Sequence, residues 1–200
     1  NYFNGDIDEV AIWNAVLSDS DITKIASKPV DFSKASAYDT DRTSNLKLWL
    51  RAGDKVLPEE DASIARSDFY TDFDGSNDYV DLGNLGLTGT YGSITAWINI
   101  PTTASADGVI ISGCDDSSNT NAMFFYYDEP GEQLAVVGDA GNKVVGGTTS
   151  INDGQWHHAV LTSDGSAYKI YLDGKEESLT VSSGSNNGNW WGDISGIDLW

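Results

Sequence analysis

The sequence predicts an all-β domain in which two antiparallel sheets form two layers. In Ser93–Ile100 and Tyr168–Leu172, apolar residues recur at every second position, a period that is typical of strands with one buried face. The 200 residues include 21 Gly and only 4 Pro, and the sequence shows no long helical pattern. This composition favours many short strands joined by tight turns, and the length suffices for one substantial core.

The clearest hairpin lies near the end of the chain. Trp156–Thr162 is apolar and β-prone, and Asp173-Gly174 is a tight turn because Gly tolerates a positive φ. A strand should return from Lys175 to about Val181. The other expected strands are Ile7–Trp13, Asn45–Ala52, Gly108–Ser112, Ala122–Tyr127, Gln133–Gly138, Lys143–Thr149 and Ile194–Trp200, together with a strand, turn and strand over Phe69–Leu82.

The first residues predict a turn, a strand and a short helix. Gly5-Asp6 is expected to turn before the strand, and Ser18 with Asp21 three residues later forms a capping-box pattern. Ile22 and Ile25 of this helix should pack down onto the sheet. Residues 26–44 are rich in Ser, Thr and Asp and are interpreted as a linker.

Charge and composition exclude several classes of partner. Eleven basic residues against 31 acidic ones give a net charge of −20, so nucleic acid and anionic membranes are poor partners. No apolar run approaches the ~20 residues of a membrane span, which predicts no membrane insertion. Cys114 is the single cysteine, so no internal disulfide is expected. The acidity is explained either by solubility or by carboxylates that hold Ca²⁺.

Three stretches resemble laminin G-like and pentraxin-like domains of the concanavalin A-like lectin/glucanase superfamily. DGQWHHAVLTSDGSAYKIYLDGKEE (Asp153–Glu177) is similar to the central signature of that family, and TDFDGSNDYVDLGN (Thr71–Asn84) is similar to its first core strand. NYFNGDIDEVAIWNAVLSDSDITKI (Asn1–Ile25) resembles its last strand and the helical turn that follows. The resemblance implies an antiparallel jelly-roll β-sandwich.

In this chain the closing motif stands first. The expected organisation is a closing strand and helix over residues 1–25, a linker over 26–44 and a laminin G-like domain over 45–200. One explanation is a polypeptide cut from a tandem array. In the other, residues 1–13 supply the missing last strand, either of their own sandwich by circular permutation or of a neighbouring copy by strand exchange.

The resemblance also implies calcium, because jelly-roll domains of this type commonly hold a structural Ca²⁺ near the paired first and last strands. The first candidate ligand set is Asp8, Asp74, Asn77 and Asp78, for which turn formation is an equal alternative. The second lies in the polar loop Gly113–Asn121 and comprises Asp115, Asp116, Asn119 and Asn121. Pentraxin-like relatives carry an Asp-Asn pair at this place, whereas this chain has Thr120-Asn121, and a solvated loop is the alternative.

Sugar binding would require aromatic platforms beside hydrogen-bonding groups. The candidates are Trp190 and Trp191 in the polar loop Ser182–Gly192, and Tyr126 and Tyr127 on a strand beside Asp128. At least one member of each pair is expected to pack into the core. Trp13, Trp49, Trp97 and Trp156 are expected to be core residues.

Catalysis is not expected. Glucanases of this fold carry a Glu-x-Asp-x-x-Glu pattern on one strand, and the nearest run here, Asp6–Glu9, lacks that spacing. His157 and His158 are neighbours on a strand, so they face opposite sides and cannot chelate one metal. They are interpreted as packing and cross-strand hydrogen-bonding residues.

We therefore expect a non-catalytic recognition or adhesion module of an extracellular or virion-surface protein. Its partner would be a surface glycan. The alternatives are a structural decoration or spacer domain of a fibre, capsid or filament, which binds only neighbouring subunits and can self-associate, and a glucanase-like glycoside hydrolase.

Overall fold

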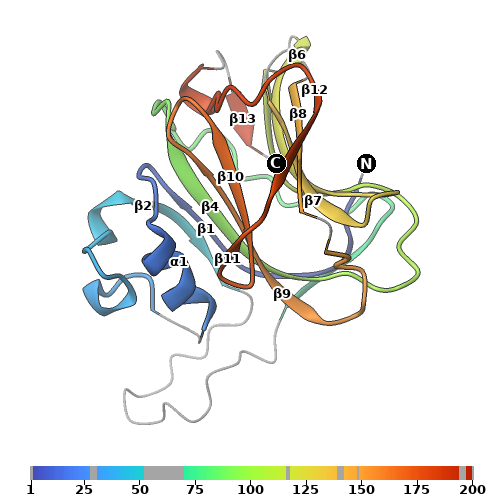
Figure 1. Ribbon diagram of the computed structural model, residues 1–200, viewed down its shortest axis with the longest axis horizontal. Helices are drawn as coiled ribbons and strands as arrows, with labels where there is room; N and C mark the ends of the chain where they lie inside the picture. Colours follow the sequence, from blue (N-terminus) through green and yellow to red (C-terminus); the bar gives the residue numbers. More distant parts are fainter. Residues whose placement is uncertain are drawn as a thin grey trace.

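The computed structural model describes residues 2–27, 31–51, 70–115, 118–138, 142–147, 149–193 and 197–199. Two antiparallel sheets pack face to face, which confirms the predicted all-β sandwich (Figure 1). No helix among these residues is long and apolar enough to cross a membrane.

One sheet has seven strands and the other has six. The seven-stranded sheet has the order β11-β10-β9-β4-β1-β2, and β3 also pairs with β1. Its strands are β1 (Asn4–Trp13), β2 (Leu46–Leu50), β3 (Thr71–Asp74), β4 (Gly92–Asn99), β9 (Trp156–Ser163), β10 (Tyr168–Leu172) and β11 (Lys175–Glu176). The six-stranded sheet has the order β12-β8-β7-β6-β5-β13. Its strands are β5 (Gly108–Asp115), β6 (Ser118–Asp128), β7 (Gln133–Gly138), β8 (Asn142–Gly146), β12 (Leu179–Ser183) and β13 (Ile197–Leu199).

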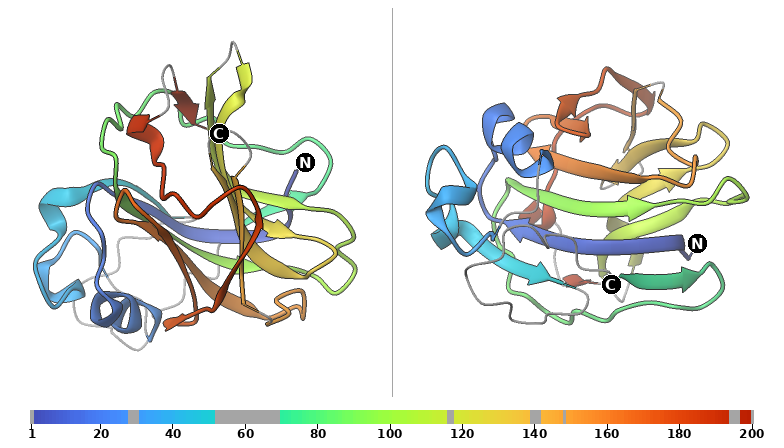
Figure 2. Two further views of the ribbon diagram at one scale, coloured as in Figure 1. Left: turned by 45° about the horizontal axis from the view of Figure 1, so that its top comes forward. Right: turned by 90° about the horizontal axis from the view of Figure 1, so that it is seen from below.

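The opening strand β1 lies inside the seven-stranded sheet of its own chain. It pairs with β4 on one side and with β2 and β3 on the other, as the right-hand view of Figure 2 shows. Gly5 belongs to this strand, so the turn expected at Gly5-Asp6 is wrong. With φ at 135°, a Cβ on Gly5 would lie 2.2 Å from the carbonyl oxygen of Asn99, and glycine is therefore required where the two strands approach. The division into domains stays a prediction.

The strands β2 and β3 together form one interrupted edge strand beside β1. Leu50 pairs with Val10 and Thr71 pairs with Ile7, so Asp8 and Glu9 lie opposite the interruption. At the same place β1 bulges against β4, where the register shifts between Asp8 and Ala11.

The outer face of the seven-stranded sheet is covered in part by α1 (Asp19–Ala26). Ser18 accepts a hydrogen bond from the Asp21 amide while the Asp21 carboxylate accepts one from the Ser18 amide, so the predicted capping box is confirmed. Ile22 and Ile25 are fully buried in the contact, as predicted.

Residues 31–44, which belong to the linker expected over 26–44, pack on the same outer face. Phe32 and Tyr38 are buried against Trp13, whose indole nitrogen donates to the Tyr38 hydroxyl at 3.1 Å. The buried Asp21 carboxylate accepts from the Asp39 amide at 2.7 Å. Two short 3-10 turns, Ala35–Ala37 and Thr43–Asn45, carry the chain to β2. Burial of the aromatic side chains of this polar stretch holds it against the sheet.

Other expected boundaries differ because pairing partners decide them. The structure ends β3 at Asp74, and residues 75–82 follow without a second multi-residue strand. The polar stretch Gly113–Asn121, expected to be a loop, instead extends β5 to Asp115 and begins β6 at Ser118. The single returning strand expected after Asp173-Gly174 is two: β11 stays in one sheet, and β12 joins the other.

Candidate functional site

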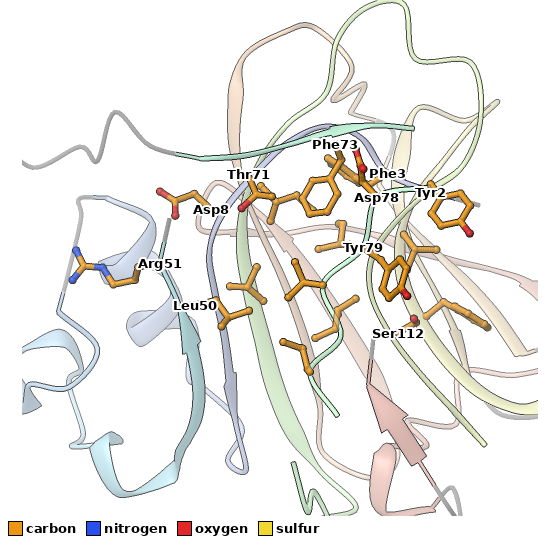
Figure 3. Close-up of a pocket in the computed structure, with 18 residues that line it drawn as sticks. Tyr2, Phe3, Asp8, Leu50, Arg51, Thr71, Phe73, Asp78, Tyr79 and Ser112 are labelled. Atoms are coloured by element: carbon orange, nitrogen blue, oxygen red, sulfur yellow. The ribbon is translucent and has the colours of Figure 1, made fainter. Parts of the chain in front are cut away.

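A cavity of about 550 Å³ lies between the two sheets at the interrupted edge (Figure 3). Strands β1, β2 and β3 line it from one side and β5 and β6 from the other, and residues 78–80 and Leu82 complete it. Its size falls within the range of small-molecule sites, which are concave and mostly apolar with a few polar groups.

The inner wall of the cavity is apolar. Ile7 and Phe73 are buried side chains of the seven-stranded sheet that belong to the core between the sheets. From the opposite sheet, Ile110 and Ile111 both contribute, although they are consecutive in β5. The register of β5 against β6 shifts between Val109 and Ile111, and this bulge lets two neighbours face the same side.

One end of the cavity carries exposed aromatic rings. Tyr79 is 62% exposed and Tyr2 is 45% exposed, and both line the cavity. Thr71, Asp78 and Ser112 add hydroxyl and carboxylate oxygens to the lining. Figure 3 draws Tyr2 and Tyr79 at one end of the view and Asp8 with Arg51 at the other.

The charge of Arg51 at this other end is balanced locally. Its Nε donates to Glu9 at 3.0 Å, and its guanidinium carbon lies 4.6 Å from the centroid of the Trp49 ring. The Trp49 indole donates to the second oxygen of Glu9 at 2.5 Å. Burial of Glu9 nevertheless raises the pKa of its carboxyl group, which Arg51 and Trp49 only partly oppose. The charged side chains of the cavity lining are the carboxylates of Asp8 and Asp78 and the guanidinium of Arg51, which gives the lining a negative balance.

The first calcium set is brought together only in part, because Asp8 lies apart from the others, and calcium at Asp74, Asn77 and Asp78 stays a prediction. The register of β1 with β3 places Asp74 opposite Asn4, and Asp8 lies four residues further along β1, about 13 Å away. Asp74 accepts from the Ser76 amide at 2.8 Å, and Asp78 accepts from the Asp74 amide at 3.0 Å. These carboxylates therefore shape the turn around Asn77, which is the alternative that the sequence allowed. Across the described ranges, no three His, Cys, Asp or Glu side chains are grouped to hold a metal ion.

The second calcium set lies at the β5–β6 hairpin. The backbones of Asp115, Asn119 and Asn121 belong to these strands, but their side chains, like the whole of Asp116, lie outside what the structure describes. A calcium site at this hairpin stays a prediction.

The aromatic residues chosen from the sequence as sugar platforms are buried, so this expectation is corrected. Trp190 and Trp191 lie in the core with ring centroids 5.2 Å apart, because the chain before them folds back over the end of the sandwich. The Gly192 amide secures this arrangement by donating to the Gly89 carbonyl at 2.9 Å. Tyr126 and Tyr127 are buried on opposite faces of β6. None of the four rings offers an open face to a sugar.

The remaining tryptophans divide into two groups. Trp13 is fully buried, as expected, whereas Trp49, Trp97 and Trp156 are only half-buried. Tyr70 packs edge-on against Trp156 at 5.8 Å between ring centroids.

The two histidines have opposite environments. His157 contacts Asp173 at 2.9 Å and Asp153 at 3.2 Å, and the hydrogen bond with Asp173 is the main reason that its pKa is raised. His158 is fully buried beside the Trp97 ring, and burial lowers its pKa to about 4. Within the described part of the chain, neither ring nitrogen of His158 has a hydrogen-bond partner. The packing and cross-strand roles expected of this pair are therefore confirmed.

Sequence reasoning missed Tyr2 and Tyr79 as site residues. Tyr79 stands beside the Asx-rich turn of FDGSNDY, and that stretch was interpreted only through its carboxylates and turn residues. An aromatic residue directly after such a turn was the available signal. Tyr2 carries no comparable signal, because only the pairing of β1 with β3 brings it to the cavity.

Comparisons with known proteins agree with this architecture. A family model described as the concanavalin A-like lectin/glucanases superfamily matches residues 74–197, more than half of the chain. No curated protein matches the sequence. Among solved structures, domains LG4-5 of the mouse laminin alpha1 chain are 16% identical with a TM-score of 0.39, over 54% of this chain and 27% of that one.

A second similar structure is the carbohydrate-binding module CBM66 from Bacillus subtilis. It is 16% identical with a TM-score of 0.28, over 61% of this chain and 83% of that one. The match of the family model over more than half of the sequence, together with the two-sheet antiparallel architecture, shows that this chain belongs to the concanavalin A-like lectin/glucanases superfamily.

Proposed function

We propose that this domain is a non-catalytic recognition module that binds neutral glycans at the cavity described above. The observation that carries the proposal is the pair of exposed rings, Tyr2 and Tyr79, at a cavity that also presents hydroxyl and carboxylate oxygens. We place the module in an extracellular or virion-surface protein, where adhesion to a glycan would serve attachment.

The chemistry of the lining supports a sugar ligand. Aromatic rings bind the apolar faces of sugars, and nearby oxygen atoms fix their orientation through hydrogen bonds. Ser112 and Asp78 supply such oxygens toward the end that carries Tyr79, as Figure 3 draws them.

The charge of the molecule supports a neutral ligand. The net charge is −20, and the cavity lining contains two carboxylates, Asp8 and Asp78, against one guanidinium, Arg51. Sulfated and uronic-acid glycans would be repelled by both features. We therefore expect neutral sugars to be preferred.

The arrangement of carboxylates supports binding without hydrolysis. Glycosidases place two carboxyl groups roughly 5 to 9.5 Å apart across the bond that they cleave. In the cavity, Asp8 comes from β1 and Asp78 comes from the turn after β3. Asp78 accepts from the Asp74 amide, and the register separates Asp8 from the position of Asp74 by about 13 Å. Asp6 and Asp72 do pair across β1 and β3, but neither lines the cavity.

An array of immobilised neutral β-glucans, galactans and mannans, each beside a sulfated or uronic counterpart, tests the proposal. Binding to at least one neutral glycan should weaken about three- to tenfold in Tyr79→Ala, since a stacked ring contributes about 0.5–1.5 kcal/mol. Tyr91→Ala is the matched control, because Tyr91 is 48% exposed and does not line the cavity.

Equal loss in both variants would contradict the site. If no glycan on the array binds and the protein self-associates as its concentration rises, a role as a structural spacer domain would be favoured instead. Release of reducing sugars from any bound polysaccharide would refute the non-catalytic part of the proposal.

A further inference from the structure

We propose that the ligand of this cavity is a neutral amphiphile. Its sugar or polyol part lies beside Tyr2 and Tyr79, and an apolar chain or ring attached to it lies between the two sheets. This inference rests on the proposed function, because it assigns the polar part of the ligand to the same end of the cavity and adds the apolar part.

The inner wall of the cavity favours an apolar part of the ligand. Ile7 and Phe73 on one side and Ile110 and Ile111 on the other offer no hydrogen-bonding side-chain atoms. A sugar hydroxyl placed among them would give up its hydrogen bonds to water without replacement, which costs free energy. A hydrocarbon group in the same place gains free energy in proportion to the apolar surface that it buries.

The polar groups lie mostly toward the two ends of the cavity. Figure 3 shows Asp8, Arg51 and Thr71 toward one end, and Tyr2, Tyr79, Asp78 and Ser112 toward the other. Such a lining matches a molecule with a polar head and an apolar body better than a uniformly hydroxylated oligosaccharide. A cavity of about 550 Å³ is large enough to enclose both parts of a small amphiphile.

The charges at the ends decide between neutral and anionic amphiphiles. At the end of the cavity with Tyr2 and Tyr79, the charged side chain of the lining is the Asp78 carboxylate. An anionic head group such as a sulfate or carboxylate would meet this like charge there. We therefore assign an uncharged head group.

Val80 offers a way to block the cavity without disturbing the core. It lines the cavity and is nevertheless 44% exposed, so a larger side chain can be accommodated by turning toward solvent or into the cavity. Val181 in β12 is 46% exposed and lies outside the lining, which makes Val181→Trp the matched control for Val80→Trp. Val80→Asp provides a second variant, which adds charge rather than bulk.

Two dyes of nearly the same shape test the apolar part alone. N-phenyl-1-naphthylamine is neutral, and 8-anilino-1-naphthalenesulfonate has the same aromatic skeleton with one sulfonate added. With the folded wild-type chain, we expect fluorescence enhancement and saturable binding of the neutral dye and at least tenfold weaker binding of the sulfonate. Val80→Trp and Val80→Asp should each reduce binding of the neutral dye at least fivefold, and Val181→Trp should leave it unchanged.

Alkyl glycosides test the connection between head group and cavity. For methyl, butyl, hexyl and octyl β-D-glucopyranoside below their micelle concentrations, calorimetry should show affinity rising about two- to fourfold per added methylene until the cavity is filled. Competition of octyl glucoside with the neutral dye should be complete.

The outcomes separate this inference from the proposed function. If neutral glycans bind through Tyr79 but chain length has no effect and the neutral dye does not bind, the inference is overturned and the proposed function stands. Dye or alkyl binding that persists unchanged in both Val80 variants would also overturn it, because the apolar site would then lie elsewhere. Chain-length dependence that is lost in Val80→Trp but kept in Val181→Trp supports it, even if the glycan array is silent.

Discussion

Replacing His158 by leucine should remove a large part of the acid sensitivity of this fold. In the folded state burial lowers the pKa of His158 to about 4, against an ordinary value of 6.5. Between these values the unfolded chain binds a proton that the folded chain does not, so stability is full above pH 6.5 and falls as the pH drops toward 4. At ~1.4 kcal/mol per pKa unit, the loss amounts to about 3 kcal/mol.

Leucine fits the site because the ring is fully buried and neither ring nitrogen has a hydrogen-bond partner among the described residues. An apolar side chain of similar size removes two unsatisfied polar atoms and leaves packing against Trp97 possible. At pH 7.5 the variant should therefore unfold with a free energy close to that of the wild type. At pH 4.5 it should be more stable by about 2 to 3 kcal/mol.

Urea unfolding followed by tryptophan fluorescence at several pH values from 7.5 to 4.5 measures this difference. His157→Gln is the matched control and should show the opposite sign. The hydrogen bond with Asp173 raises the pKa of His157 in the folded state. The stabilisation that this hydrogen bond provides is therefore complete below pH 6.5 and is lost as the pH rises through the pKa of the folded state. Identical pH profiles for His158→Leu and the wild type would refute the reasoning.

Two further predictions concern the backbone and the metal. Gly5→Ala should lower the free energy of unfolding by at least ~2 kcal/mol, since its Cβ would lie 2.2 Å from the Asn99 carbonyl oxygen. Gly83→Ala, where φ is also positive but no atom lies within 4 Å of the added Cβ, should cost less in the same urea titration, and equal losses would contradict the steric explanation. If the hairpin with Asp115 and Asp116 holds Ca²⁺, EDTA should lower the melting temperature by several degrees, and Asp116→Asn should abolish that response. A melting temperature that EDTA leaves unchanged would refute the predicted Ca²⁺ site.

Features that depend on neighbouring residues were predictable. The alternation in Tyr168–Leu172 and Ser93–Ile100 predicted strands, and both are present as β10 and β4, the latter shifted by one residue at each end. The capping box of Ser18 and Asp21 predicted a helix beginning at Asp19. A strand period and a helix cap involve residues at most a few positions apart, so their energetics are visible in a short window of sequence.

The candidate site was less predictable, because its geometry depends on pairing between distant segments. Asp8 and Asp74 are both acidic, but Asp8 lies in the middle of β1 and Asp74 ends β3, and the register of the two strands separates them. Trp190 and Trp191 stand in a polar loop, which suggested exposure, but the fold of that loop over the sandwich buries both rings. A one-residue change in either arrangement would alter which side chains share a face.

By itself the amino-acid sequence determined the all-β class, most strand positions, the capped helix and the strongly negative charge, since each follows from local pattern or composition. Only the tertiary structure decided that β1 enters the sheet between β4 and the interrupted edge strand. That insertion brings Tyr2 to the same cavity as Tyr79, which lies 77 positions further along the chain (79 − 2). Contacts between segments so far apart depend on how the whole chain packs, and no short window of sequence contains that information.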